Sequence, residues 1–556
     1  MVESYNKWKE HLEGTADGKT LVAMTQDEIA DAFSGNIAFG TGGLRGVMGL
    51  GTNRLNLYTV RRVTQGLAKT ILSNEFPKSV CVAYDTRFNS DIFAQEVCNV
   101  FSSFGIAVYM FDKPVPTPAL SFAIRHLKLG WGVAITASHN PQEYNGYKVY
   151  NHQGVQVTDQ TASEITKSIE SVEFFEPLPG NNNAHITTLG AELMDAYLND
   201  IVSYVNNNQH SQDKLELPPD NISKQTDYPF VYSALHGAGA YAVPDVLKRL
   251  GYSPICIQQE PDGAFGGLKT PNPEEPVVYE KAINAAEENK AKMLLATDPD
   301  CDRVGVLIKT DRSEADSKAK ISKSKEFETL NGNQIGALLI DYLAETHGVQ
   351  PGDTVITTIV SGLLGELISK KHGLEFKRLL TGFKYIGEYA EQLPKGKQFF
   401  FGYEESYGFL AGDGARDKDA VIATALIVKM ADRYGQSRKT LLERWEELSE
   451  EHGYCLEDLH SANVPQNKQK EIMTKLRTGI NIEDLTKTED YLQGYNNLPT
   501  ADVLKLVFED KSWAAIRPSG TEPKIKLYTG TTAETKEKAK TSLKKLTETL
   551  LEIMRV

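Results

Sequence analysis

The sequence has few cysteines, no long apolar run and no excess of positive charge. Its 5 cysteines are odd in number, scattered and without a Cys-X-X-Cys pair, which argues against a disulfide framework and a zinc site. No stretch approaches the roughly 18 apolar residues of a membrane span, and the polar N-terminus lacks the apolar core of a signal peptide. The 60 Lys and Arg are outnumbered by 74 Asp and Glu, and the net charge of -14 argues against a nucleic-acid binder. We therefore expect a cytoplasmic protein that binds neither nucleic acid nor membranes.

Short apolar runs alternate with helical patterns through most of the 556 residues, which is typical of an α/β protein. The runs 79–84 and 131–136 are predicted to be buried strands, which end at 85–87 (DTR) and 137–141 (ASHNP). Because ligands gather at the carboxyl ends of strands in open α/β sheets, both breaks are candidate site loops. At roughly 150 residues per domain, the length predicts about three to four domains.

The sharpest local signal is the segment 298–303 (DPDCDR), which lies between two strand-like runs. Its carboxylates at Asp298, Asp300 and Asp302 alternate in a tight turn and can converge on one hard divalent cation. The alternative is a solvated acidic turn. Buried flanking strands and the adjacent Arg303 favour the metal site. Three carboxylates plus an open position suit Mg²⁺, which completes its coordination with water or phosphate oxygen.

A second segment, 136–141 (TASHNP), places a serine just past a predicted strand end. Such a serine is well placed to be a nucleophile or a phosphate carrier, provided that a metal ion or a base activates it. His139 and Lys148 are available as proton-transfer groups. Taken alone, the segment is better explained as an ordinary turn, because Ser-His-Asn-Pro is also good turn chemistry.

Three further segments carry groups that bind phosphate or sugar. The segment 517–523 (RPSGTEP) offers an arginine, two hydroxyls and a glycine, which suit an anion nest or, equally, a hairpin turn. The segment 40–46 (GTGGLRG) is predicted to be a flexible loop with one guanidinium, and it lacks the Gly-Lys-Ser/Thr ending of a nucleotide P-loop. In 402–408 (GYEESYG), a carboxylate and a hydroxyl two residues apart can hold two sugar hydroxyls, or they belong to an ordinary polar strand end. Together the five segments indicate phosphoryl transfer on a sugar phosphate.

The chain resembles the α-D-phosphohexomutase family, most closely its phosphoglucomutase branch, which also contains phosphopentomutases. The resemblance covers nearly the whole chain and rests on six segments in the family's order. These are the arginine loop 40–46, the phosphoserine loop 136–141, the metal loop 298–303, the recognition loop 381–384 (TGFK), the sugar loop 402–406 and the distal phosphate loop 517–523.

The resemblance implies a heart-shaped α/β protein of four domains around a central cleft, with three related α/β domains and a C-terminal α+β domain. The expected domains are 1–207 with the phosphoserine loop, 208–327 with the metal loop, 328–452 with the sugar loop and 453–556 with the phosphate loop. Two polar stretches, 206–228 and 310–328, read as domain boundaries or surface excursions.

The resemblance also implies the role of each site residue. Ser138 would carry the phosphoryl group, and with Asp298, Asp300 and Asp302 it would coordinate one Mg²⁺ per subunit. Proton transfer and support of the moving phosphoryl group would fall to Lys148, His139, Arg45 and Arg303. The substrate would be bound by Thr381, Gly382, Lys384, Glu404, Ser406, Arg517, Ser519, Gly520 and Thr521.

The implied reaction converts glucose 1-phosphate to glucose 6-phosphate through glucose 1,6-bisphosphate, which is both intermediate and activator. The protein would be a monomer or a homodimer. Phosphopentomutase and phosphomannomutase activities remain alternatives within the family, because only the sugar clamp would differ. A metal-dependent sugar phosphatase is an alternative of another class, although it would not need a distal phosphate clamp. A sugar-phosphate sensor that is not an enzyme is a third, although it would be expected to have lost a serine, lysine or aspartate that this chain keeps.

Overall fold

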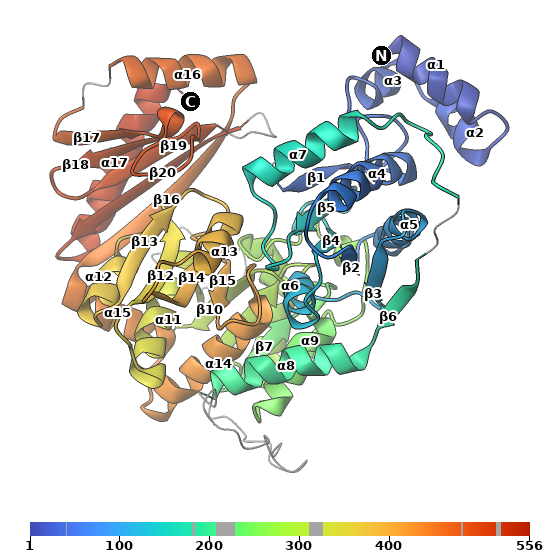
Figure 1. The fold of residues 1–556 in the computed structure, drawn as a ribbon. Helices are drawn as coiled ribbons and strands as arrows, with labels where there is room; N and C mark the ends of the chain where they lie inside the picture. Colours follow the sequence, from blue (N-terminus) through green and yellow to red (C-terminus); the bar gives the residue numbers. More distant parts are fainter. Residues whose placement is uncertain are drawn as a thin grey trace. The chain divides into compact units, whose positions relative to one another are not determined.

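The structure is a computed structural model that describes residues 1–40, 42–180, 184–206, 228–310, 326–479, 482–518 and 524–555 (Figure 1). Most of the two polar stretches predicted above, 207–227 and 311–325, lies outside the described residues. The chain forms two compact units, which we describe separately. The first unit is Met1–Leu330, Ile386–Leu393 and Ser406–Arg433, and the second is Asn331–Tyr385, Pro394–Glu405 and Tyr434–Val556.

The first unit begins with three short helices, α1 (Val2–His11), α2 (Ala16–Ala23) and α3 (Gln26–Ala32). Trp8 is 1% exposed and meets Phe33, Tyr58 and Phe174 edge-on, with ring centroids 5.2–5.7 Å apart. Aromatic packing of this kind attaches helices that are too short to be stable alone.

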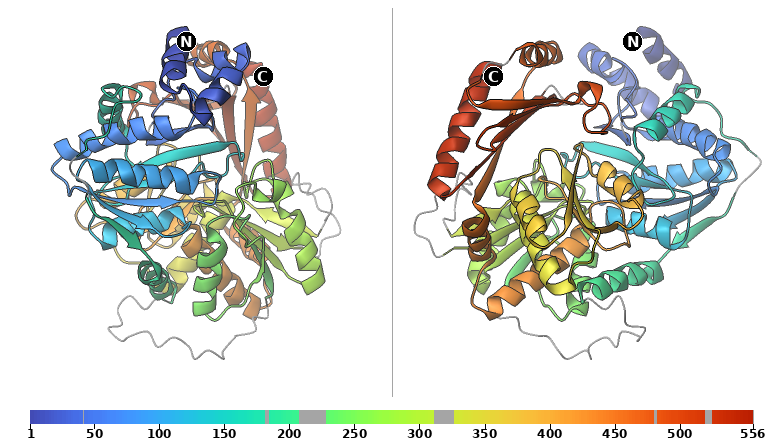
Figure 2. Two further views of the ribbon diagram at one scale, coloured as in Figure 1. Left: turned by 90° about the vertical axis from the view of Figure 1, so that its right-hand side faces the viewer. Right: turned by 60° about the vertical axis from the view of Figure 1, so that its left-hand side comes forward.

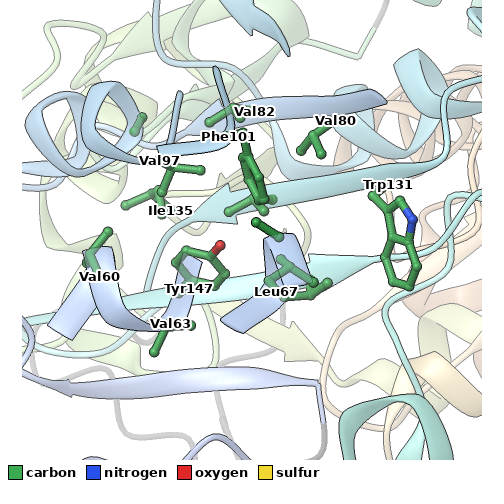
Figure 3. Packing of buried hydrophobic residues seen from close by; sticks show 14 of the residues in the cluster. Val60, Val63, Leu67, Val80, Val82, Val97, Phe101, Trp131, Ile135 and Tyr147 are labelled. Carbon is green, nitrogen blue, oxygen red and sulfur yellow. The ribbon is translucent and has the colours of Figure 1, made fainter. Parts of the chain in front are cut away.

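A six-stranded sheet follows, with strand order β1-β5-β4-β2-β3-β6. Strands β2 and β4 pair in parallel and are buried almost throughout, as expected for strands covered on both faces. Side chains of α4 and α5 pack with these strands in one apolar cluster (Figure 3). The two predicted strands, 79–84 and 131–136, are confirmed as β2 and β4. The elements are β1 (Gly43–Val47), α4 (Leu57–Ser73), β2 (Ser79–Tyr84), α5 (Ser90–Ser103), β3 (Ala107–Phe111), α6 (Thr117–His126), β4 (Trp131–Ile135), β5 (Tyr144–Tyr150), α7 (Asp159–Glu170), β6 (Ile186–Leu189) and α8 (Ala191–Val205).

The prediction of a flexible loop over 40–46 is wrong in its second half. Residues from Gly43 onward form strand β1, which pairs antiparallel with β5. The close approach of the two strands explains the glycine, because a Cβ at Gly43 would lie 2.2 Å from the carbonyl oxygen of Tyr147. Arg45 and Lys148 therefore project from paired strands, which hold their backbones more firmly than a loop would.

The second sheet of the first unit has the order β11-β10-β9-β7-β8. Strands β9 and β10 form an antiparallel pair, and the six residues between them are the predicted metal loop. Both strands that flank this loop are as the sequence predicts. The elements are β7 (Phe230–Ser233), α9 (Gly239–Arg249), β8 (Ile255–Ile257), α10 (Glu280–Asn289), β9 (Met293–Thr297), β10 (Val304–Lys309) and β11 (Phe327–Leu330); β15 (Phe409–Ala411) and most of α14 (Ala420–Gln436) also belong to this unit.

The second unit contains a parallel sheet and an antiparallel sheet. In the first, β12 (Asp353–Thr358) pairs in parallel with β13 (Glu375–Leu379) and β14 (Gln398–Tyr403). The other has the order β16-β20-β19-β18-β17, and helix α17 (Lys536–Met554) packs along it (Figure 2). Its remaining elements are α11 (Gly332–His347), α12 (Leu364–Lys371), α13 (Phe383–Glu391, which runs into the first unit), α15 (Leu441–His452), β16 (Tyr454–Asn463), α16 (Gln466–Thr478), β17 (Leu485–Asp490), β18 (Leu504–Phe508), β19 (Trp513–Pro518) and β20 (Lys524–Ala533).

The four sheets agree with the predicted class, three α/β parts followed by an α+β part. Among the described residues, none of the helices combines the length and the apolar composition that crossing a bilayer requires.

Candidate functional site

The phosphoserine loop and the metal loop meet in the first unit. Ser138 lies just past the end of β4, and its side chain is 3% exposed. Its Oγ donates a hydrogen bond of 2.7 Å to Oδ2 of Asp298 and lies 3.2 Å from Nδ1 of His139. Its backbone is left-handed, with φ of 52°, and its N–H donates to Oγ1 of Thr136 at 2.8 Å. The structure thus places the predicted nucleophile against the predicted metal ligands.

The three aspartates of the metal loop converge. One carboxylate oxygen from each of Asp298, Asp300 and Asp302 lies within 4.8 Å of the others, and all three residues are buried. The turn is closed by Oδ1 of Asp298, which accepts the N–H of Asp302 at 3.1 Å and that of Arg303 at 3.0 Å. Cys301 adopts a left-handed backbone at φ 52°, which lets the short segment reverse direction.

Two buried lysines face these carboxylates. Nζ of Lys148 lies 2.8 Å from Oδ2 of Asp300 and 3.3 Å from Oδ2 of Asp302. Nζ of Lys418 lies 3.1 Å from the same Asp302 oxygen and 3.1 Å from Oδ1 of Asp417. Asp300 also accepts the hydroxyl of Thr117 at 3.1 Å.

The charges decide which carboxylates stay ionised. Burial opposes ionisation, but Lys418 and Lys148 lower the pKa of Asp302 below its usual value. Burial and the two neighbouring carboxylates raise the pKa of Asp298 well above its usual value. Burial would lower the pKa of Lys148, but Asp300 and Asp302 raise it, so this lysine is protonated.

The donor set fits a hard divalent cation. Oδ1 of Asp300 and Oδ1 of Asp302 are buried and accept no hydrogen bond. A buried carboxylate oxygen without a donor is costly, and a cation ligated by oxygen would satisfy both. The three aspartates can therefore bind a metal ion.

His139 and Arg303 form a second polar group beside the serine. NH1 of Arg303 lies 2.6 Å from Nδ1 of His139. Because a guanidinium can only donate, Nδ1 is the acceptor and the imidazole carries its hydrogen on Nε2. Burial and the charges of Arg303 and Arg45 lower the pKa of His139 well below its usual value, so the ring is neutral. Arg45 is exposed, and its NH1 donates to Oδ1 of Asn140 at 2.8 Å.

Two of the predicted substrate segments meet in the second unit. The N–H of Gly382 donates to Oε1 of Glu404 at 2.9 Å, and Glu404 is 6% exposed. Thr381 is half-buried, and Lys384 is buried near the start of α13, with Nζ 4.7 Å from the centre of the Tyr385 ring. The recognition loop and the sugar loop are therefore parts of one local structure.

The remaining predicted residues are placed only in part. Ser406 is half-buried and belongs to the first unit. Arg517 lies near the end of β19, half-buried, in register with Lys526 of β20. Ser519, Gly520 and Thr521 lie outside the described residues.

The structure brings two further residues to this site: Lys418, which the sequence analysis missed, and Arg87, whose segment 85–87 it named as a candidate loop without giving the arginine a role. Lys418, in the segment Asp417-Lys418-Asp419, contacts the metal loop although more than a hundred residues separate them. Arg87 binds the backbone of the phosphoserine loop. The position of Arg87 just after a buried strand could have indicated a site residue. Lys418 has no such indication, because a single lysine between two aspartates is common on protein surfaces.

Models of all four domains of one family match the chain. Descriptions of these models read phosphoglucomutase/phosphomannomutase α/β/α domains I, II and III and C-terminal domain. They match residues 36–176, 195–311, 331–448 and 467–544, in that order. The predicted four-domain α/β architecture is thereby confirmed.

Curated relatives and solved structures agree with these matches. A phosphoglucomutase of Staphylococcus haemolyticus is 34% identical over 552 residues, which cover 94% of this chain and 95% of that protein. One of Staphylococcus epidermidis is 34% identical over 551 residues, covering 94% and 96%. The open form of parafusin, a phosphoglucomutase of Paramecium, has a TM-score of 0.72 at 16% identity and covers 95% of this chain and 96% of its own. A putative phosphomannomutase from Thermus thermophilus has a TM-score of 0.69 at 23% identity, covering 93% and 99%. These two structures share the fold of this chain.

Proposed function

The chain belongs to the phosphoglucomutase/phosphomannomutase family, and we propose that it interconverts α-D-glucose 1-phosphate and glucose 6-phosphate. The observation that carries the proposal is the buried hydroxyl of Ser138, held 2.7 Å from Asp298 in a cluster of three aspartates. A sugar-binding protein without phosphoryl transfer would have no use for a buried serine at this place. All five cysteines are free thiols, which supports a reducing compartment, the cytoplasm.

Phospho-Ser138 is the proposed phosphoryl donor. The bond from phosphorus to Oγ of Ser138 breaks while a bond to the free hydroxyl of the sugar phosphate forms, which gives glucose 1,6-bisphosphate, and the proton that this hydroxyl loses is balanced by the one that Oγ of Ser138 gains. The bisphosphate then presents its other phosphate to Ser138, and the reverse transfer releases the isomer and restores phosphoserine. Asp298, Asp300 and Asp302 are the proposed ligands of one Mg²⁺, which when bound supplies positive charge to the phosphoryl oxygens.

Several side chains support the transfer. Lys148 is the proposed proton-transfer group, because its Nζ is buried, protonated and next to the metal loop. His139 is neutral and its Nδ1 accepts from Arg303, which fixes the ring 3.2 Å from Oγ of Ser138, while the serine hydroxyl donates its hydrogen to Asp298. Arg45 supplies positive charge near the same loop through its contact with Asn140.

The remaining predicted residues bind the sugar phosphate in this proposal. Glu404 and Ser406 take two sugar hydroxyls in either orientation of the bisphosphate. Thr381, Gly382 and Lys384 recognise the substrate beside Glu404, which the hydrogen bond from Gly382 supports. The phosphate that does not react is bound by Arg517 together with Ser519, Gly520 and Thr521.

An assay of glucose 6-phosphate formation from glucose 1-phosphate tests the proposal. We expect rapid formation with Mg²⁺ and a trace of glucose 1,6-bisphosphate, and a decline without the bisphosphate. Mannose 1-phosphate and ribose 1-phosphate are compared in parallel, and faster turnover of either would move the substrate within the family. Release of inorganic phosphate in large excess over isomer would contradict a mutase and favour a phosphatase.

A further inference from the structure

The guanidinium of Arg87 binds the backbone of the phosphoserine loop at four points. NH2 donates to the carbonyl oxygens of Ser138 and Asn140, both at 2.5 Å. NH1 donates to the carbonyl oxygens of Pro141 and Tyr144, at 2.9 and 3.1 Å. Arg87 is itself 3% exposed, so water does not replace these bonds. One side chain thus holds almost the whole turn that follows β4.

Arg87 is in turn held from two directions. Its Nε lies 3.3 Å from Oδ2 of Asp85, and both side chains are buried. Its Cζ lies 4.8 Å from the centre of the Phe265 ring, which comes from the part of the first unit that contains the second sheet. Phe265 is fully buried, and its turn is fixed by Asp262, which accepts the N–H groups of Ala264 and Gly266 at 2.9 Å. The planar group therefore has a single orientation.

The four bonds act on a backbone that would not adopt its shape by itself. Ser138 is left-handed at φ 52°, a region that serine seldom occupies. Such a conformation persists only where the surroundings hold it, and it is this conformation that directs Oγ at Asp298. The four hydrogen bonds from Arg87 to the carbonyls of this loop supply that restraint, and the planar fork of a guanidinium can make them together.

We propose that Arg87 is a positioning residue that holds Ser138 ready to accept and release the phosphoryl group. This assignment rests on the proposed function, in which Ser138 carries phosphate. Arg87 acts through the loop and touches neither the sugar nor the phosphate in this role. Its loss should therefore slow transfer to and from Ser138 and leave binding of the sugar phosphate nearly unchanged.

The test compares Arg87→Lys with the wild type in the full-length protein. Lysine keeps the charge but cannot form the four bonds. We expect kcat to fall by about ten- to a hundredfold while KM for glucose 1-phosphate stays within about twofold. We also expect Ser138 to take up phosphate more slowly. This uptake is measured by intact mass spectrometry after dephosphorylated protein is mixed with glucose 1,6-bisphosphate.

Arg62→Lys is the matched control. Arg62 donates to the carbonyl oxygen of Val172 at 2.7 Å and lies 4.8 Å from the Phe174 ring, but it is not bound to the phosphoserine loop. We expect it to lower the melting temperature without slowing phosphate uptake. If Arg87→Lys loads phosphate at the wild-type rate, or loses activity only as Arg62→Lys does, the assignment is overturned.

If Arg87→Lys does not fold, Phe265→Leu tests the same assignment. It keeps an apolar side chain at this position but removes the ring face under the guanidinium, and we expect a smaller loss of kcat in the same direction. An unchanged kcat and loading rate would overturn the assignment. A wild-type protein that takes up no phosphate on Ser138 would instead contradict the proposed function itself, and the assignment with it.

Discussion

Oγ of Ser138 donates a hydrogen bond of 2.7 Å to Oδ2 of Asp298, a residue 160 positions further along the chain. The serine follows β4 of the first sheet and the aspartate follows β9 of the second. The contact therefore depends on the packing of two sheets within one compact unit. It joins the proposed phosphate carrier to the proposed metal site.

Replacing Ser138 by alanine should abolish mutase activity and leave the fold intact. The hydroxyl is the proposed acceptor of the phosphoryl group, and it contacts Asp298 of the metal loop directly. Conversion of glucose 1-phosphate is measured by the activity assay, and phosphate uptake by intact mass spectrometry; both should be lost. Ser103→Ala is a matched control, because this buried serine donates within α5 to the carbonyl oxygen of Val100 at 2.7 Å, and it should keep its activity. A Ser138→Ala protein with near-normal turnover would contradict the phosphoserine mechanism.

Replacing Asp300 by asparagine should weaken metal binding with sugar binding largely kept. The change removes one negative charge from three buried carboxylates, while the hydrogen bonds from Thr117 and Lys148 remain possible. We expect the half-saturating Mg²⁺ concentration to rise at least about tenfold. A ligand that binds the folded state raises the melting temperature, so the increase that Mg²⁺ gives should also shrink. Asp31→Asn, at an exposed carboxylate beside Arg54, is the control and should keep the wild-type Mg²⁺ titration. If Asp300→Asn also keeps the wild-type Mg²⁺ titration, Asp300 is not a metal ligand.

Replacing Lys418 by methionine should destabilise the protein more without Mg²⁺ than with Mg²⁺. Its Nζ lies 3.1 Å from carboxylate oxygens of both Asp302 and Asp417, all of them buried. Removing one partner of such a pair leaves an uncompensated charge at a cost of about 3–5 kcal/mol. We expect a lower melting temperature in chelator, a smaller decrease in Mg²⁺, and a lower kcat. Lys429→Met, which loses a bond to the carbonyl oxygen of Val205 at 2.8 Å, should show no such dependence on Mg²⁺.

Stability of the second unit should depend on pH through Lys505. Burial and the charge of Arg378 lower the pKa of Lys505 to about 7, and its Nζ donates to the carbonyl oxygen of Ile359 at 2.6 Å. The unfolded chain then binds a proton that the folded one does not, so stability rises with pH from about 7 to about 10.5 and changes no further below 7. The slope should reach about 1.4 kcal/mol per pH unit.

Melting temperatures of wild type and Lys505→Met between pH 7 and 10 check this expectation. The melting temperature of the wild type should rise relative to that of the variant as pH rises, because methionine carries no proton in the folded or the unfolded state. For Lys544→Met, at a side chain that is 70% exposed, the plot of melting temperature against pH should be parallel to that of the wild type. Parallel curves for Lys505→Met would show that Lys505 does not titrate differently in the folded state.

Local signals in the sequence predicted the strands and loops that carry the site. The run 79–84 is apolar throughout and forms β2, and the segment 298–303 forms the turn between β9 and β10. The loop 40–46 was predicted wrongly in part, because its glycines signal flexibility when read alone. In the structure Gly43 instead permits close pairing with Tyr147, a contact set by a strand about a hundred residues away.

The α/β class, the resemblance to a family, and the choice of Ser138 and the three aspartates as site residues could all be predicted from the amino-acid sequence. Short-range patterns suffice for these, because strand runs, turn chemistry and alternating carboxylates are written in neighbouring residues. The contact of Lys418 with Asp302 and the hydrogen bonds from Arg87 to the phosphoserine loop became visible only in the folded chain. Contacts between residues so distant in sequence arise from sheet packing and burial, which no local pattern encodes.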